Sequence, residues 1–196
     1  MAQHLNRLFL VLLISLVTFS SYAAEKWILD NQHTYVLWTI KHLNFSYQTG
    51  KWFANGEIIF DPNNPQNSKV TASIQVADVV TGIPELDKHL REKLFFDTAK
   101  YPTATFSSNR VEMLSKNTAK VHGTLTLRGV TKPVTLDVML NNIGKHPMKE
   151  RMTAGFSATT TIKRSDFGMT NLQEALGDDV KIEIGAEAYQ VNPTQS

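Results

Sequence analysis

Residues 81–134 read TGIPELDKHLREKLFFDTAKYPTATFSSNRVEMLSKNTAKVHGTLTLRGVTKPV. Leu86, Leu90 and Leu94 recur at every fourth position, which is the spacing of one helical face. We therefore expect a short helix over residues 84–96. Further along, residues 123–127 (GTLTL) alternate apolar and polar side chains, and this period of two is typical of a half-buried strand. The stretch predicts one short helix inside a run of strands, where the helix can cover an apolar interior.

The same alternation recurs along the rest of the chain. Its clearest case is residues 180–188 (VKIEIGAEA), in which every second residue is apolar. Turn-forming residues at 61–65 (DPNNP) and 141–144 (NNIG) are expected to separate strands. We count about eight strands and no parallel crossover, which indicates an all-β domain. Eight antiparallel strands can close into a barrel that holds side chains or one ligand, but a two-sheet sandwich gives the same alternation.

The N-terminus has the features of a secretory signal peptide. Arg7 precedes a nearly apolar run at residues 8–17, and Ser21 and Ala23 then supply small residues at the two positions that a signal peptidase reads. Because the run is shorter than the ~20 residues that span a bilayer, we expect cleavage rather than an N-terminal anchor helix. Residues 1–23 are therefore predicted to be removed, and residues 24–196 to form a single exported domain.

The composition limits the classes of partner. The chain has 196 residues, of which 42% are hydrophobic, and a formal net charge of +2. Such a small charge does not supply the basic field that nucleic-acid binding requires. The absence of cysteine excludes thiol catalysis and a lipidated cysteine anchor.

No residue pattern points to catalysis or to a resident metal. His33 and His42 are an odd number of positions apart, so a regular strand directs them to opposite faces. No serine stands in a nucleophile-elbow motif, and the acidic pair at residues 178–179 has the sequence context of a solvated turn. We therefore predict no catalytic residue, no metal and no cofactor.

The order of several short motifs resembles the YceI-like family over nearly the whole exported chain. The strongest motifs are residues 87–91 (DKHLR), 95–97 (FFD), 101–102 (YP) and 123–134 (GTLTLRGVTKPV). Further matching motifs lie at residues 27–30, 33–42, 56–61, 106–108, 166–168 (DFG) and 177–180 (GDDV). Each motif is weak alone, whereas their order and spacing together are specific.

The resemblance implies a lipocalin-like barrel that binds a polyisoprenoid or similar long-chain amphiphile, such as a prenylated quinone, in the bacterial periplasm. It does not imply a catalytic residue. Because the chain has no cysteine for lipidation and the signal is expected to be cleaved, we also expect no stable membrane anchor. The expected partner is the lipid itself, and a homodimer stays open. Two other functions also stay open at this point: a solid-core module that binds a protein partner, and an enzyme that acts on a lipid.

The inward faces of the predicted strands supply the candidate lining. We expect the lipid tail to lie among the apolar side chains of Trp38, Ile40, Phe60, Phe106, Leu125 and Phe156. Leu86, Leu90 and Leu94 would place the helix over the core or the barrel mouth. His42 and Arg91 are the candidates for polar contact with the head group. For His42 the alternative is an interior histidine that is hydrogen-bonded within the protein.

Overall fold

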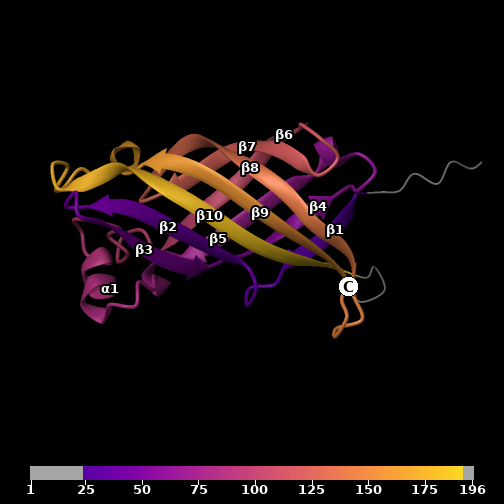
Figure 1. Ribbon diagram of the computed structural model, residues 1–196, viewed down its shortest axis with the longest axis horizontal. Coiled ribbons are helices and arrows are strands. Elements are labelled where there is room, and N and C mark those ends of the chain that lie inside the picture. Colours follow the sequence, from indigo (N-terminus) through magenta and orange to yellow (C-terminus); the bar gives the residue numbers. More distant parts are fainter. Residues whose placement is uncertain (1–23, 192–196) are drawn as a thin grey trace, which may run out of the picture.

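The computed structural model describes residues 24–191, and strands account for most of them (Figure 1). The strands are β1 (Glu25–Leu29), β2 (Tyr35–His42), β3 (Ser46–Phe53), β4 (Asn55–Phe60), β5 (Lys69–Gln75), β6 (Thr103–Met113), β7 (Thr118–Leu127), β8 (Val130–Lys145), β9 (Met152–Lys163) and β10 (Leu176–Gln190). The helical elements are α1 (Pro84–Leu90) and the 3-10 turns η1 (Pro65–Asn67), η2 (Val76–Asp78) and η3 (Arg164–Phe167). Within residues 24–191, no helix has the length and apolar character needed to cross a bilayer. The predicted signal peptide lies outside the described residues.

The ten strands belong to one antiparallel sheet that closes on itself. β10 pairs with β2 over residues 176–185 and with β1 over residues 188–190, so β1 and β2 follow one another along the same neighbour. In the same way, β4 pairs with β1 and β3 pairs with β2, so β4 and β3 together fill the next strand position. The result is a barrel with eight strand positions, which confirms the predicted eight-stranded antiparallel barrel and excludes the two-sheet sandwich.

Two short interruptions explain why ten strands fill eight positions. Between β1 and β2, Asp30 N–H and Thr34 Oγ1 both donate to Glu187 O, at 2.8 and 3.2 Å. Between β3 and β4, Ala54 N–H donates to Thr34 O at 3.0 Å. Thr34 and Ala54 are both buried, so these hydrogen bonds fix the two interruptions side by side in the barrel wall.

The segment from η2 to residue 102 covers the edge of β3, and α1 lies in it at the end of the barrel opposite the C-terminus of β10 (Figure 1). β3 is not hydrogen-bonded to β5; instead it forms an isolated bridge between Lys51 and Val80. The Trp52 indole N–H donates to Val76 O at 3.0 Å, and the Phe96 ring packs edge-on against Trp52 at 5.2 Å. These contacts confirm that the predicted helical segment covers the apolar interior.

α1 is shorter than the helix predicted over residues 84–96. It ends at Leu90, and the turns that follow bring Phe96 N–H to Leu90 O at 3.0 Å. Phe95 is buried, whereas Leu94 is 54% exposed. The prediction that Leu94 shares the inward face is therefore wrong, because the end of the helix at Leu90 lets the two phenylalanines reach the interior in its place.

β8 runs through residues 141–144, where the sequence predicts a turn. The register with β9 shifts between Leu140 and Asn142, which lie opposite Phe156 and Gly155, so a bulge absorbs the turn-forming residues within the strand. The predicted turn at residues 61–65 is confirmed. There the Asp61 carboxylate accepts hydrogen bonds from the two following asparagine N–H groups, at 3.0 and 2.9 Å.

Buried apolar side chains form two clusters, one toward each end of the barrel. The cluster near α1 consists of Trp38, Trp52, Val76, Val79, Leu90, Phe95, Ala104, Leu127, Phe167 and Met169. The cluster at the opposite end of the barrel consists of Trp27, Leu29, Phe60, Ala154 and Ala188. In this second cluster the Phe60 ring packs edge-on against Trp27 and Phe156, with centroid distances of 5.7 and 6.0 Å.

Candidate functional site

The barrel encloses a cavity of about 1020 Å³. This volume is at the upper end of the ~300–1,000 Å³ that ligand pockets usually have. All ten strands and α1 contribute side chains to its wall. The alternation of β10 directs Val180, Ile182, Ile184 and Ala186 inward, and all four line the cavity. The interior is therefore hollow, which argues against the solid-core alternative.

The cavity is long and apolar. On β10 its wall runs from Leu176 to Ala186, which is about 33 Å of strand at roughly 3.3 Å per residue. With the strand tilt of ~35–45° that is usual in barrels, this corresponds to an axial length of about 25 Å. In the part of the chain that the structure describes, the wall contains no aspartate and no glutamate. Most of its side chains are aliphatic or aromatic.

The structure brings nearly all the predicted site residues into this wall. Those that line the cavity are Trp38, Ile40, His42, Phe60, Leu86, Leu90, Phe106, Leu125 and Phe156. They come from β2, β4, α1, β6, β7 and β9, and they meet only because the barrel closes. Their contact with a ligand stays a prediction.

Arg91 is the exception. Its side chain is exposed and does not line the cavity, because its Nε donates to Ala77 O at 2.7 Å. A guanidinium held in this position does not fit the predicted contact with a head group. The arginine of the helical segment instead ties the end of α1 to η2.

A different arginine lies in the cavity wall. Arg164 begins η3 and is only 5% exposed. Its Nε donates to Gly177 O at 3.0 Å and its Nη1 to Met169 O at 2.7 Å. Its Nη2 is buried and has no hydrogen-bond partner among the described residues. His42 pairs with Leu176, next to Gly177, so His42 and Arg164 flank the same stretch of β10 at the α1 end of the barrel.

Sequence reasoning did not single out Arg164. It directly follows the alternating strand β9, and an arginine at a strand end is ordinarily exposed. The available signal was its position two residues before the DFG motif that carries part of the family resemblance. Its guanidinium group is held by the backbone carbonyls of Met169, in the turn after η3, and of Gly177 in β10, and the alternation of β9 does not reveal these contacts.

The charge of Arg164 has no directly bonded carboxylate among residues 24–191. Burial lowers the pKa of Arg164, and the charge of Asp178 raises it. The Asp178 carboxylate is bonded elsewhere, since it accepts hydrogen bonds from Ser165 N–H at 3.0 Å and Ser165 Oγ at 2.8 Å. Burial raises the pKa of Asp178, but these hydrogen bonds and the charges of Lys163 and Arg164 have the larger effect and lower it. Both groups are therefore charged at neutral pH.

Trp38 supplies a second donor without an acceptor. It is 6% exposed, lines the cavity and packs against Trp52 with a centroid distance of 6.2 Å. Its Nε1 is buried without a hydrogen-bond partner in the described part of the chain. Trp38 Nε1 lies over Gly50 in the barrel wall. Because buried polar groups in folded proteins are usually paired, the unpaired Nη2 of Arg164 makes the wall suited to a guest that carries an acceptor atom.

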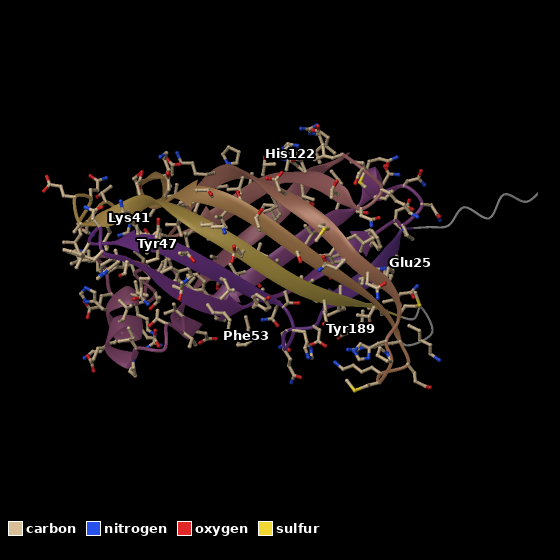
Figure 2. The ribbon with its side chains drawn as sticks, in the orientation of Figure 1. Glu25, Lys41, Tyr47, Phe53, His122 and Tyr189 are labelled. Carbon is tan, nitrogen blue, oxygen red and sulfur yellow. The ribbon has the colours of Figure 1, made fainter. Side chains whose placement is uncertain are left out.

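Exposed polar side chains line the end of the cavity that lies opposite α1. Its rim contains Lys69, Lys116, Asn117, Asn141 and Asn142, all of which are exposed. Water can satisfy these side chains, so this end is a solvated rim. Figure 2 shows the two ends of the barrel by their outer side chains: Lys41 and Tyr47 lie at the α1 end, and Glu25 and Tyr189 lie at the other.

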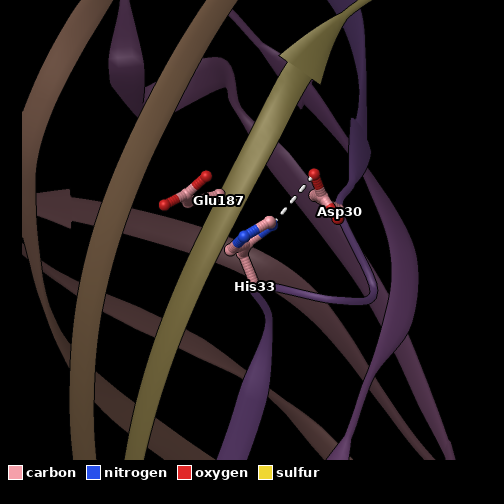
Figure 3. Close-up of side chains that lie close together, drawn as sticks. All are labelled: Asp30, His33 and Glu187. Carbon is pink, nitrogen blue, oxygen red and sulfur yellow. Dashed lines mark ion pairs between the residues drawn. The ribbon is translucent and has the colours of Figure 1, made fainter. Parts of the chain in front are cut away.

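Asp30, His33 and Glu187 bring three potential metal ligands together at the turn between β1 and β2 (Figure 3). Asp30 already has cationic partners, since Lys149 Nζ lies 2.8 Å and Arg151 Nη2 lies 3.5 Å from its Oδ2. The hydrogen bond from Lys149 is the main reason that the pKa of Asp30 falls to about 2, against the opposing effect of burial. We assign this cluster a structural role, because the Asp30 carboxylate is already paired with Lys149 and Arg151.

The fold and its cavity define a lipocalin-like barrel with one covering helical segment. The sequence profile of the YceI-like domain matches residues 27–188. The chain therefore belongs to the YceI-like family.

Two relatives described as UPF0312 proteins align over most of their length. The protein of Ectopseudomonas mendocina strain ymp is 38% identical over 173 residues, which cover 87% of this chain and 88% of the relative. The protein of Pseudomonas putida strain W619 is 37% identical over 158 residues, which cover 79% of this chain and 82% of the relative.

Solved structures share the fold. BcnA of Burkholderia cenocepacia has a TM-score of 0.71 and 25% identity, over 81% of this chain and 98% of BcnA. The YCEI protein of Campylobacter jejuni has a TM-score of 0.69 and 32% identity, over 78% of this chain and 90% of that protein. A polyisoprenoid binding domain from Saccharophagus degradans, implicated in plant cell wall breakdown, has a TM-score of 0.62 over 87% of this chain and all of that domain. At 18% identity, this last similarity concerns the fold alone.

Proposed function

We propose that this protein binds one long-chain amphiphile, a polyisoprenoid or a similar lipid such as a prenylated quinone, with its hydrocarbon tail in the barrel. The observation that carries the proposal is the cavity of about 1020 Å³, whose wall is mostly apolar. Membership of the YceI-like family supports it, and so does the shared fold of a domain described as polyisoprenoid binding.

The energetics of such binding need no catalytic group. Burial of a hydrocarbon tail contributes roughly 0.8 kcal/mol for each CH₂ that leaves water. Association and the ordering of a flexible tail cost part of this gain. For a long tail that fills an axial length of about 25 Å, the free energy gained by burial exceeds these costs. The cavity wall therefore has only to be apolar and continuous.

We further propose that the protein carries its lipid and does not transform it. An enzyme would need clustered titratable groups beside the substrate. Within residues 24–191, the wall offers two histidines, two rim lysines and Arg164 but no carboxylate to act with them. The proposed place of action is the periplasm, which rests on the sequence of residues 1–23 and on the family resemblance.

Solvent extraction of the protein from its native periplasm, followed by mass spectrometry of the extract, tests the proposal. We expect one prenyl species in about equimolar amount with the protein, and a second exported protein purified in parallel gives the background. An extract that stays empty, also after incubation with prenylated quinones and prenyl alcohols, would contradict lipid binding and favour a module that binds a protein partner.

A further inference from the structure

We propose that Arg164 binds the polar head of the lipid, and that this head presents a hydrogen-bond acceptor: a carbonyl oxygen or an anionic oxygen. This inference rests on the proposed function, because it concerns the other end of the same guest. It makes Arg164, and not Arg91, the arginine that selects the ligand.

The first support is the unpaired Nη2 of Arg164. The side chain is 5% exposed and lines the cavity, and its Nη2 has no partner in the part of the chain that the structure describes. Buried polar groups are nearly always hydrogen-bonded in folded proteins, so an unpaired donor in a cavity wall indicates a partner that enters the cavity. The exposed lysines at the other end have no such need, since water reaches them.

The second support is the rigidity of the guanidinium group. Its Nε and Nη1 are held by Gly177 O and Met169 O, at 3.0 and 2.7 Å. Because the group is planar, two fixed nitrogens also fix the direction of the third. Nη2 is thus positioned before the ligand arrives, and little conformational entropy is lost when it binds an acceptor.

The chemistry of the surroundings decides which head fits. A guanidinium group can only donate hydrogen bonds, so its partner must accept them. The wall of the described barrel contains no carboxylate, and Asp178 is bonded to Ser165. The positive charge of Arg164 therefore favours an electron-rich oxygen and disfavours an ammonium head.

The position of Arg164 orients the ligand. Arg164 and His42 flank the start of β10 at the α1 end, whereas Phe60 and Phe156 line the cavity toward the other cluster. The head group then lies at the α1 end, and the tail extends toward Phe60 and Phe156. Trp38, which also has an unpaired donor, lies on the path between them.

Probes that share one geranylgeranyl chain and differ only in the head test the inference. The heads are a phosphate, a benzoquinone, a primary amine and a terminal methyl group. Binding is followed by tryptophan fluorescence, since Trp38 and Trp52 line the cavity. We expect the phosphate or the benzoquinone to bind at least about tenfold more tightly than the amine and the methyl probe, as one charge-assisted hydrogen bond provides. The stronger of the two identifies an anionic or a neutral carbonyl head.

The variant Arg164→Met removes the guanidinium donors and keeps an unbranched apolar side chain. We expect it to bind all four probes with about equal affinity, close to that of the methyl probe for the wild type. Arg110→Met is the matched control, because it makes the same substitution at an exposed arginine of β6 that does not line the cavity, and it should keep the wild-type preference. If Arg164→Met does not fold, the guanidinium nitrogen signals of wild-type Arg164 in an NMR titration replace it. They should move with the acceptor probes and stay unchanged with the methyl probe.

The possible failures are distinct. Equal affinity of the wild type for all four heads would overturn the role of Arg164 and leave lipid binding intact. A preference that survives in Arg164→Met, or guanidinium signals that respond equally to the methyl probe, would also overturn it. Binding of none of the probes would contradict the proposed function itself.

Discussion

Gly50 of β3 lies directly beneath the indole ring of Trp38 on β2. The two residues are opposite one another in the strand pair, and a Cβ atom added at Gly50 would overlap the ring. The missing side chain lets the indole lie against the barrel wall instead of projecting into the cavity. This contact links a single glycine to the space that is available for a ligand.

Substitution of Gly50 by valine should therefore push Trp38 inward. We expect Gly50→Val to lose about 1–3 kcal/mol of unfolding free energy through overpacking, and to bind a prenyl lipid more weakly because the cavity narrows. Urea unfolding and lipid titration measure the two effects. Gly144→Val is the control, since a Cβ at Gly144 meets no atom within 4 Å. Wild-type stability and binding in Gly50→Val would show that Trp38 has room to move elsewhere.

A charge in the middle of the cavity should abolish lipid retention. Phe106 of β6 lines the cavity opposite Leu125 of β7, so a glutamate at this position would place a carboxylate against the tail. Because an unpaired charge is strongly unfavourable in an apolar interior, we expect Phe106→Glu to purify without lipid. Extraction and mass spectrometry of the purified variant give the readout.

Two further variants separate the effect of a charge inside the cavity from the effects of a surface charge and of a narrower cavity. Phe53→Glu adds the same charge to an exposed position of β3 and should retain lipid. Leu125→Trp narrows the cavity without any charge and should reduce retention. A folded Phe106→Glu that still carries stoichiometric lipid would mean that the tail lies elsewhere.

The apolar wall of the cavity could be predicted from the sequence because strand alternation is a local property. Every second residue from Val180 to Ala186 was expected to point inward, and each of them lines the cavity. The same reasoning placed His42 with Trp38 and Ile40 on one face, and all three line the cavity.

The features that the sequence did not reveal depend on turns and contacts that helix and strand periodicity do not describe. α1 ends at Leu90 although the leucine spacing continues beyond it, and the turn that follows buries Phe95 and half-buries Phe96. Likewise, the guanidinium group of Arg164 is held by the backbone carbonyls of Met169 and Gly177, so nothing in its local sequence distinguishes it from an exposed arginine. Local periodicity predicts which face a residue occupies, but not which polar residue the closed barrel encloses.

The ion pairs of Asp30 should make stability depend on pH in the acid range. Its folded-state pKa is about 2, against about 3.9 in an unfolded chain, so ionised Asp30 stabilises the fold above pH 4. This contribution, of the order of 2 kcal/mol, is lost as the pH falls from about 4 to 2. We expect Asp30→Asn to be less stable than wild type by that amount at pH 7, and the difference to shrink toward zero as the pH falls through 2.

Denaturant unfolding of both proteins at several pH values measures this difference. Asp137→Asn is the matched control, because Asp137 forms an exposed ion pair with Lys120 and such pairs contribute about 0–1 kcal/mol. A stability gap between wild type and Asp30→Asn that stays constant from pH 7 to pH 2 would contradict the assigned role of the Asp30 carboxylate.

The hydrogen bond from Trp52 to Val76 should hold the covering segment on the barrel. The indole N–H donates to Val76 O at 3.0 Å in a buried position, at the edge of β3 that does not pair with another strand. Trp52→Phe keeps an aromatic ring but removes the donor, so we expect a loss of about 1–3 kcal/mol of unfolding free energy. Amide hydrogen exchange should accelerate in residues 76–102 more than in β7 to β9, because the segment opens locally. Tyr47→Phe, which alters an exposed aromatic residue of the same strand, should leave both quantities unchanged. If exchange accelerates equally throughout the barrel, the bond stabilises the whole fold, and the covering segment does not open as a separate unit.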